Sequence, residues 1–101
     1  MSLEALREQI PDFAKDIRLN LGSLANETTL TDQQKWGTFL ASALACGQPA
    51  VIKAFEIEAA SCLTPEAITA VRSAAAIMAM NNVYYRSLHL LTNPEYRTLR
   101  A

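Results

Sequence analysis

Hydrophobic residues recur along the chain at intervals of three and four positions, which is the spacing of one face of an α-helix. The first such stripe consists of Leu3, Leu6 and Ile10. Ser2 stands before it as a suitable capping residue, and Pro11 either ends this helix or begins the next one. A second stripe continues with Phe13, Ile17 and Leu21. Residues 22–29 follow as a polar stretch that is predicted to connect two helices.

Three strong start signals divide the rest of the chain into helices. The segment "TDQQ" from Thr31 to Gln34 has the form of a capping box, and Gly47 is placed to stop the helix that follows. Gln48 with Pro49, and then Thr64 with Pro65, begin two more helices. The inner positions predicted for the first two of these helices are Trp36, Phe39, Leu40, Ala43 and Leu44, then Val51, Ile52, Phe55 and Ala59.

The helix that begins near Thr64 can run to about Leu91, a length of about 40 Å. Asn93, Pro94 and Glu95 then start one more short turn or helix. No alternating strand pattern, Gly/Ser linker or low-complexity segment interrupts this order. The pattern therefore predicts an all-α fold of five to six helices without a sheet, forming a single domain over residues 1–101.

The composition adds an excess of apolar surface to this picture. Half of the 101 residues are hydrophobic and only 19% are charged, against an average of about 25% in globular domains. A domain of this size buries only part of its surface, so the excess favours burial against another chain. We therefore expect a homo-oligomer rather than a stable monomer.

Charge and hydropathy exclude several classes of partner. The net charge is −1 and the nine basic residues are scattered, so no basic stripe is present for nucleic acid. No apolar run reaches the length of a membrane span. The opening segment "MSLEALREQIPDF" contains acidic residues and no apolar block, unlike a signal or transit peptide. The expected location is the cytoplasm, where thiols stay reduced.

Two cysteines, Cys46 and Cys62, are the first candidates for chemistry. A helix between them would hold their Cα atoms about 20 Å apart, whereas a disulfide needs roughly 7 Å or less. No Cys-x-x-Cys pair, metal-ligand cluster or cofactor motif is present. We interpret both thiols as buried and unreactive, with Cys46 the better candidate for reactivity because it lies near a helix junction.

A second candidate is the polar segment "NNVYYRSLH", which contains the only histidine, His89. No Ser-His-Asp, Cys-His or Glu-His arrangement accompanies His89, so a place near a helix C-terminus is its simpler interpretation. The polar residues before it are interpreted as a seam at a helix–helix or subunit contact: Asn81, Asn82, Tyr84, Tyr85 and Arg86. Glu56 and Glu58 lie on different sides of their helix and are not expected to form an acid–base pair.

Three segments carry a family resemblance: "PDFAKDIRLNL" at 11–21, "WGTFLASALA" at 36–45 and "AAAIMAMNNVYYR" at 74–86. Together they resemble the N-terminal half of the AhpD family of alkyl hydroperoxide reductases, within the carboxymuconolactone decarboxylase-like superfamily. The similarity covers nearly the whole chain in order, and "MNNVYYR" is its most specific part.

The resemblance implies an all-helical fold of two related halves, assembled as a homotrimer, with an antioxidant role. It also implies a Cys-x-x-Cys pair with a following histidine, assisted by a glutamate, that reduces a peroxiredoxin or a peroxide. Electrons would come from a lipoyl-bearing protein through an adaptor. A low-pKa thiolate attacks in such chemistry, and a second thiol resolves the product.

The departure from the family lies in the catalytic residues, which belong to the second half and so to positions beyond this chain. By alignment of the two halves, Gly47, Ala50 and Ala54 occupy the places of the two cysteines and the histidine, and Cys46 misses the first place by one residue. No catalytic, cofactor-binding or metal-binding residue is therefore carried over.

Two functions remain open from the sequence. The chain is either part of an AhpD-like peroxide-reducing enzyme that is inactive by itself, or a stand-alone non-catalytic helical module for oligomerisation or binding. A downstream Cys-x-x-Cys followed by histidine in the same reading frame would identify the first.

Overall fold

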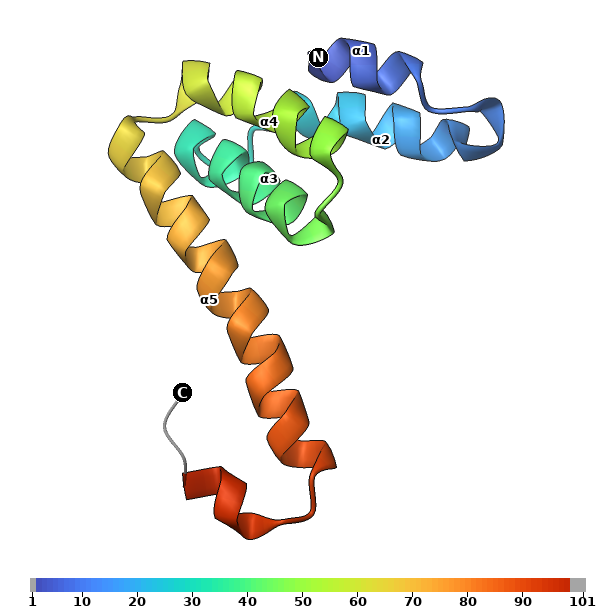
Figure 1. Ribbon diagram of the computed structural model, residues 1–101. Helices are drawn as coiled ribbons and strands as arrows, with labels where there is room; N and C mark the ends of the chain where they lie inside the picture. The colour runs from blue at the N-terminus through green and yellow to red at the C-terminus, as the bar shows by residue number, and fades with distance from the viewer. Residues whose placement is uncertain (1, 99–101) are drawn as a thin grey trace.

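A computed structural model describes residues 2–98 of the chain, and Figure 1 shows their arrangement. Five α-helices and two short 3-10 helices follow one another without a strand in this described part. Their bounds are α1 Leu3–Glu8, η1 Asp12–Ala14, α2 Lys15–Ala25, α3 Asp32–Cys46, α4 Pro49–Cys62, α5 Pro65–Leu90 and η2 Pro94–Thr98. The predicted all-α class without a sheet is confirmed.

The predicted helix starts at Ser2, Thr31, Gln48 and Thr64 are also confirmed, each by a side-chain cap. Ser2 accepts a hydrogen bond from the amide of Ala5, and Thr64 accepts one from Ala67. Thr31 and Gln34 form the complete capping box, each side chain bonding to the other residue's amide at 3.1 Å. These caps satisfy amides that would otherwise lack a partner at the helix N-terminus.

Gly47 ends α3 in the left-handed conformation, with φ at 75°. A Cβ atom added there would meet nothing within 4 Å, so the turn between α3 and α4 lies in open space. The glycine is therefore required by the backbone conformation and not by close packing.

Substitution of two glycines by alanine is expected to change stability in opposite directions. Gly47→Ala should lower the free energy of unfolding by about 1 kcal/mol, because the left-handed conformation strains an L-residue. Gly37→Ala should raise it by up to about 1 kcal/mol, because alanine favours the helix and its Cβ would contact Val71 at an ordinary 3.5 Å. Urea unfolding at one protein concentration measures both changes, and shifts in the same direction would contradict this account.

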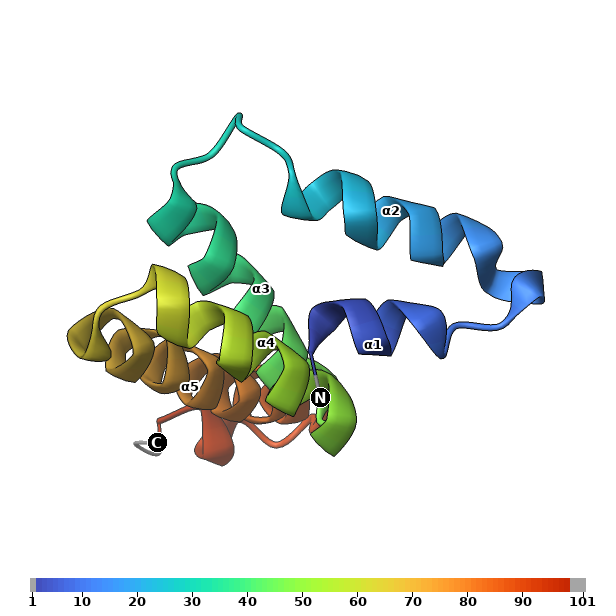
Figure 2. The same ribbon diagram turned by 90° about the horizontal axis from the view of Figure 1, so that it is seen from above.

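The core lies between the antiparallel helices α3 and α4, with α1 on one side and the first turns of α5 on another (Figure 2). Leu40 is fully buried, and the ring of Phe39 lies 5.3 Å from Trp36 and 5.5 Å from Phe55 between ring centres. The other buried residues are Leu3, Ala43, Ala54, Ala59 and Leu63. The inner positions predicted for α3 and α4 are thus confirmed, and Ala54 joins them.

Helices α1 and α2 form an arm beside this core, and its details differ from the predicted ones. Helix α1 ends at Glu8, and Pro11 stands directly before η1, which agrees with the predicted alternative that Pro11 begins the next helix. Helix α2 extends through Gly22 to Ala25, so residues 22–25 are helical and not part of a connector. Gly22 is tolerated there because the Arg7 guanidinium lies against it, only 2.9 Å from where a Cβ would be.

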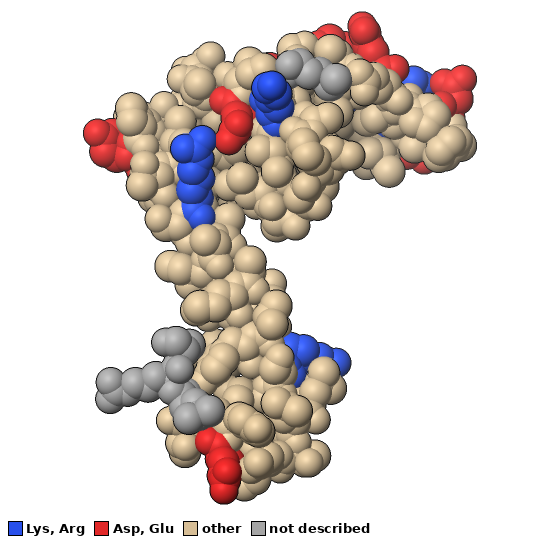
Figure 3. Space-filling view, in the orientation of Figure 1, with Lys and Arg blue, Asp and Glu red and all other residues tan. Residues whose placement is uncertain are grey.

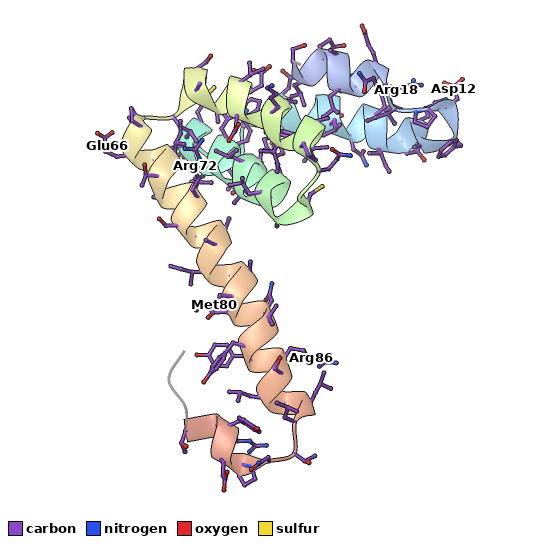
Figure 4. The ribbon with its side chains drawn as sticks, in the orientation of Figure 1. Asp12, Arg18, Glu66, Arg72, Met80 and Arg86 are labelled. Carbon is purple, nitrogen blue, oxygen red and sulfur yellow. The ribbon has the colours of Figure 1, made fainter. Side chains whose placement is uncertain are left out.

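Two arginines hold the arm together. Arg7 donates to the carbonyl of Arg18 at 3.3 Å. Arg18 in turn donates to the carbonyl of Ile10 at 3.1 Å and to Asp12 at 3.2 Å (Figure 4). Phe13 is 93% exposed and Ile17 60% exposed, so these two residues of the second apolar stripe face away from the core, whereas Leu21 packs against it.

The turn after α2 is organised around Glu27. Its carboxylate accepts hydrogen bonds from the Thr29 hydroxyl at 2.7 Å and from the amides of Thr28 and Thr29. These bonds, led by the Thr29 hydroxyl, hold the pKa of Glu27 below its ordinary value of 4.5. Because the pKa of Glu27 is lower in the folded than in the unfolded state, the ionised carboxylate stabilises the fold at pH values above its ordinary pKa. This stabilisation is lost as the pH falls through the lowered pKa of the folded state.

The longest helix, α5, has 26 residues and passes beyond the end of the α3–α4 pair (Figure 1). It ends at Leu90, one residue before the predicted limit, and η2 follows as the predicted short turn. The molecule measures 49 × 36 × 26 Å, with a radius of gyration of 16.9 Å. A compact chain of this length would have about 13 Å, so the described fold is extended.

Candidate functional site

The two thiols lie in the open, which overturns the expectation that they are buried. Cys46 is the last residue of α3 and Cys62 the last residue of α4, and both are free and exposed. Cys46 lies beside Gly47, where the chain turns in open space. After Cys62, it is Leu63 that occupies the buried position at the next junction. The preference of free cysteine for burial therefore does not hold at these two helix ends.

Both thiols are expected to react in the native protein. Because each is exposed, a small aromatic disulfide reagent should modify two equivalents without denaturant. The rates should lie within about tenfold of those in urea, since access is not limited by unfolding. Cys46→Ser and Cys62→Ser separate the two signals. A thiol that stays protected until the protein unfolds would contradict the exposed positions.

The three positions that align with the two cysteines and the histidine of the family, Gly47, Ala50 and Ala54, lie at the junction of α3 and α4 and in the first turns of α4. Gly47 contributes only its turn, and Ala50 uses its amide to donate to the Gln48 side chain at 3.1 Å. Ala54 is fully buried against the core. Of the side chains at and beside these places, Cys46 carries the only thiol, and no described group of three His, Cys, Asp or Glu could hold a metal ion.

The two carboxylates of α4 point to different neighbours, as predicted. Glu56 accepts a hydrogen bond from Arg72 of α5 at 3.1 Å, and this partly exposed ion pair contributes less than about 1 kcal/mol. Glu58 instead lines a depression beside α1, together with Leu3 and Arg7. The arrangement joins helices and offers no acid–base pair.

Most of the polar segment of α5 lies on one face of the helix, which does not include Tyr84. A shallow depression on it is lined by Met78, Asn81, Asn82, Tyr85, Arg86 and His89. Met78 and Asn82 also line a hollow against Thr38 and Ser42 of α3, so this face continues the side of α5 that packs on the core. His89 lies in the last turn of α5, as predicted. The N-terminal part of this polar face therefore lies against α3, which supports the predicted helix–helix contact. The role of the polar face as a subunit contact stays a prediction.

The structure brings none of these candidates together into one reactive centre. Cys46 ends α3 and Cys62 ends α4, and the polar face of α5 belongs to a different helix. In residues 2–98, no helix combines the length and apolarity that a membrane span requires.

Comparison with known proteins agrees with the family resemblance seen in the sequence. No protein-family model matches the chain. Proteins named alkyl hydroperoxide reductase AhpD match all 101 residues, with 56% identity in Maricaulis maris, 58% in Methylocella silvestris and 56% in Streptomyces avermitilis. The chain covers 58%, 57% and 57% of these relatives, so it spans a little over half of their length. Over its full length, the chain is therefore a homologue of the alkyl hydroperoxide reductases AhpD.

Proposed function

We propose that this chain is the N-terminal part of an AhpD-like alkyl hydroperoxide reductase with an antioxidant role, and that it does not itself carry the Cys-x-x-Cys-histidine site. The observation that supports this most is the identity of 54–58% over the full chain with proteins of that name. The chain itself contributes the helical scaffold, because glycine and alanine stand at the aligned reactive places and the two cysteines lie at the C-terminal ends of two different helices, α3 and α4.

The proposal includes the assembly and partners that the family resemblance implies. The working unit is a homo-oligomer, a trimer by resemblance, that receives electrons from a lipoyl-bearing protein through an adaptor and passes them to a peroxiredoxin or a peroxide. We place it in the cytoplasm, where reducing conditions would keep both exposed thiols free.

A chimera tests the proposal. The chain replaces the matching residues of the Maricaulis maris relative, and hydroperoxide reduction is measured with dihydrolipoamide as the reductant. The chimera should retain turnover within about tenfold of the unmodified relative, a change of ~1.4 kcal/mol in the barrier. Circular dichroism and sedimentation establish that both proteins are folded and equally assembled.

The alternative function is a stand-alone helical module for oligomerisation or binding. The exposed apolar residues of α5, such as Ile77 and Val83, favour it because they offer a surface for another protein. A chimera that folds and assembles but shows no turnover would support this module and contradict the proposed enzyme.

A further inference from the structure

One lysine of α3 joins the end of α2 to the core. The Lys35 ammonium donates to the carbonyl of Ala25 at 2.9 Å and to that of Glu27 at 3.1 Å. It also lies 3.9 Å from a carboxylate oxygen of Asp32 and 5.5 Å from the ring centre of Trp36. The Lys35 side chain is only 11% exposed, and a lysine is rarely so buried unless its charge has partners. Its charge therefore binds the last turn of α2 and the turn that follows to the start of α3.

The rest of α2 has few attachments to the core. All of its residues stay partly exposed, and Leu21 and Ala25 are its side chains that pack against the buried cluster. Figure 2 shows α2 running outward from the core alongside α1. Helical segments with little buried apolar surface open at a lower free energy than the core does.

The bonds at the other end of α2 stay within the arm. Arg18 donates to the carbonyl of Ile10 and to Asp12, which both precede α2 by only a few residues. Figure 3 shows acidic and basic side chains together at this far end of the arm. The two ends of α2 thus differ, because only the Lys35 end is bonded across to a helix of the core.

We propose that α2 and the turn after it, residues 15–31, form a strap that opens from the core as one unit, with Lys35 as its latch. Opening breaks both bonds of Lys35, while the Arg18 bonds stay closed and keep the far end of the strap in place. Helices α3 and α4 remain packed in the open state, because Leu40 and Phe55 are buried between them. This motion is separate from peroxide reduction and does not rest on the proposed function.

Opening of the strap uncovers an aromatic surface of the core. Trp36 is only 9% exposed, and it lines a depression between the arm and the α3–α4 pair. Gly22, Ala25 and Asn26 of the strap form one wall of this depression. The closed strap therefore hides the indole of Trp36, and the open strap presents it to solvent.

Amide hydrogen exchange of the 101-residue chain tests the strap. The amides of residues 19–25 should exchange as a group, at least about tenfold faster than the hydrogen-bonded amides of α3, because the strap opens without the core. Lys35→Met removes the charge and keeps an unbranched side chain of similar length. It should speed exchange of residues 19–25 by a further factor of about ten or more, because hydrogen bonds from a charged donor are the strong ones. Exchange in α3 and α4 should stay within about threefold of that in the parent chain.

Lys53→Met is the matched control, because Lys53 is an exposed lysine of α4. It should leave exchange of residues 19–25 within about threefold of the parent chain. Equal rates for α2 and α3 in the parent chain, which needs no substitution, would overturn the strap. A Lys35→Met variant that exchanges faster in α2, α3 and α4 alike would show that the whole fold opens together, and would overturn it too. Equal effects of Lys35→Met and Lys53→Met on residues 19–25 would overturn the assignment of Lys35 as the latch.

Discussion

Leu40→Ala is expected to remove about 2–5 kcal/mol from the free energy of unfolding. Leu40 has no exposed surface and is the largest fully buried side chain of the described residues. It lies in α3 within the cluster that joins α1, α3 and α4, so its loss leaves a cavity between helices that cannot easily close. Because small domains have a total stability of about 5–15 kcal/mol, a loss of this size threatens folding itself.

Urea unfolding followed by far-ultraviolet circular dichroism measures this effect, with all proteins at one concentration so that association does not alter the comparison. Leu19→Ala is the matched control, because Leu19 lies on α2 and is 53% exposed. The free energy of unfolding of Leu19→Ala should stay within about 0.5 kcal/mol of that of the parent chain. Equal losses for both variants would contradict the position of the core between α3 and α4.

Much of this core could be predicted from the sequence, because its signals are local. The caps at Thr31 and Thr64 and the left-handed stop at Gly47 depend on a few neighbouring residues, and each is present in the structure. Helical spacing then determines which residues of α3 and α4 face inward. The close approach of Arg7 to Gly22 was not predictable in this way, since Arg7 lies fifteen positions earlier in the chain.

The wrong predictions share another physical cause, which is that spacing identifies a face but not what covers it. Phe13 and Ile17 share the expected stripe, yet they lie on the arm away from the core. The cysteines were expected to be buried from a general preference of the residue type, whereas their exposure follows from their place at two helix ends. Ile77 and Val83 of α5 are a further case, because their apolar character is visible in the sequence while their exposure is visible only in the fold.

The chain alone is expected to show no catalysed reduction of hydroperoxide. A thiolate can attack the O–O bond once, which gives a sulfenic acid and releases the alcohol. Turnover then needs a second thiol within bonding distance, a Cα separation of roughly 7 Å or less. Cys46 ends α3, just before the turn into α4, and Cys62 ends α4, a helix of 14 residues that is about 20 Å long, so neither can resolve the other.

Without a reductant, consumption should stop at no more than about one equivalent of hydroperoxide per reactive thiol. With excess dihydrolipoamide, the rate should equal that of an unstructured cysteine peptide at the same thiol concentration, because the reductant must then do all of the resolving. A working dithiol site would exceed that rate by a large factor, since enzymes accelerate reactions by about a millionfold or more.

The assay is run on the chain, on Cys46→Ser and on Cys62→Ser, with the peptide and a sample without protein as references. Cys46→Ser is the more informative variant, because Cys46 lies one residue from the place aligned with the first family cysteine. Each variant is expected to consume one equivalent of hydroperoxide less than the parent chain, because it lacks one thiol. Sustained turnover far above the peptide, abolished by Cys46→Ser, would show that the junction of α3 and α4 carries its own redox chemistry. The thiol at the end of α3 would then be a catalytic residue, and the division between a scaffold and a separate reactive part would be wrong.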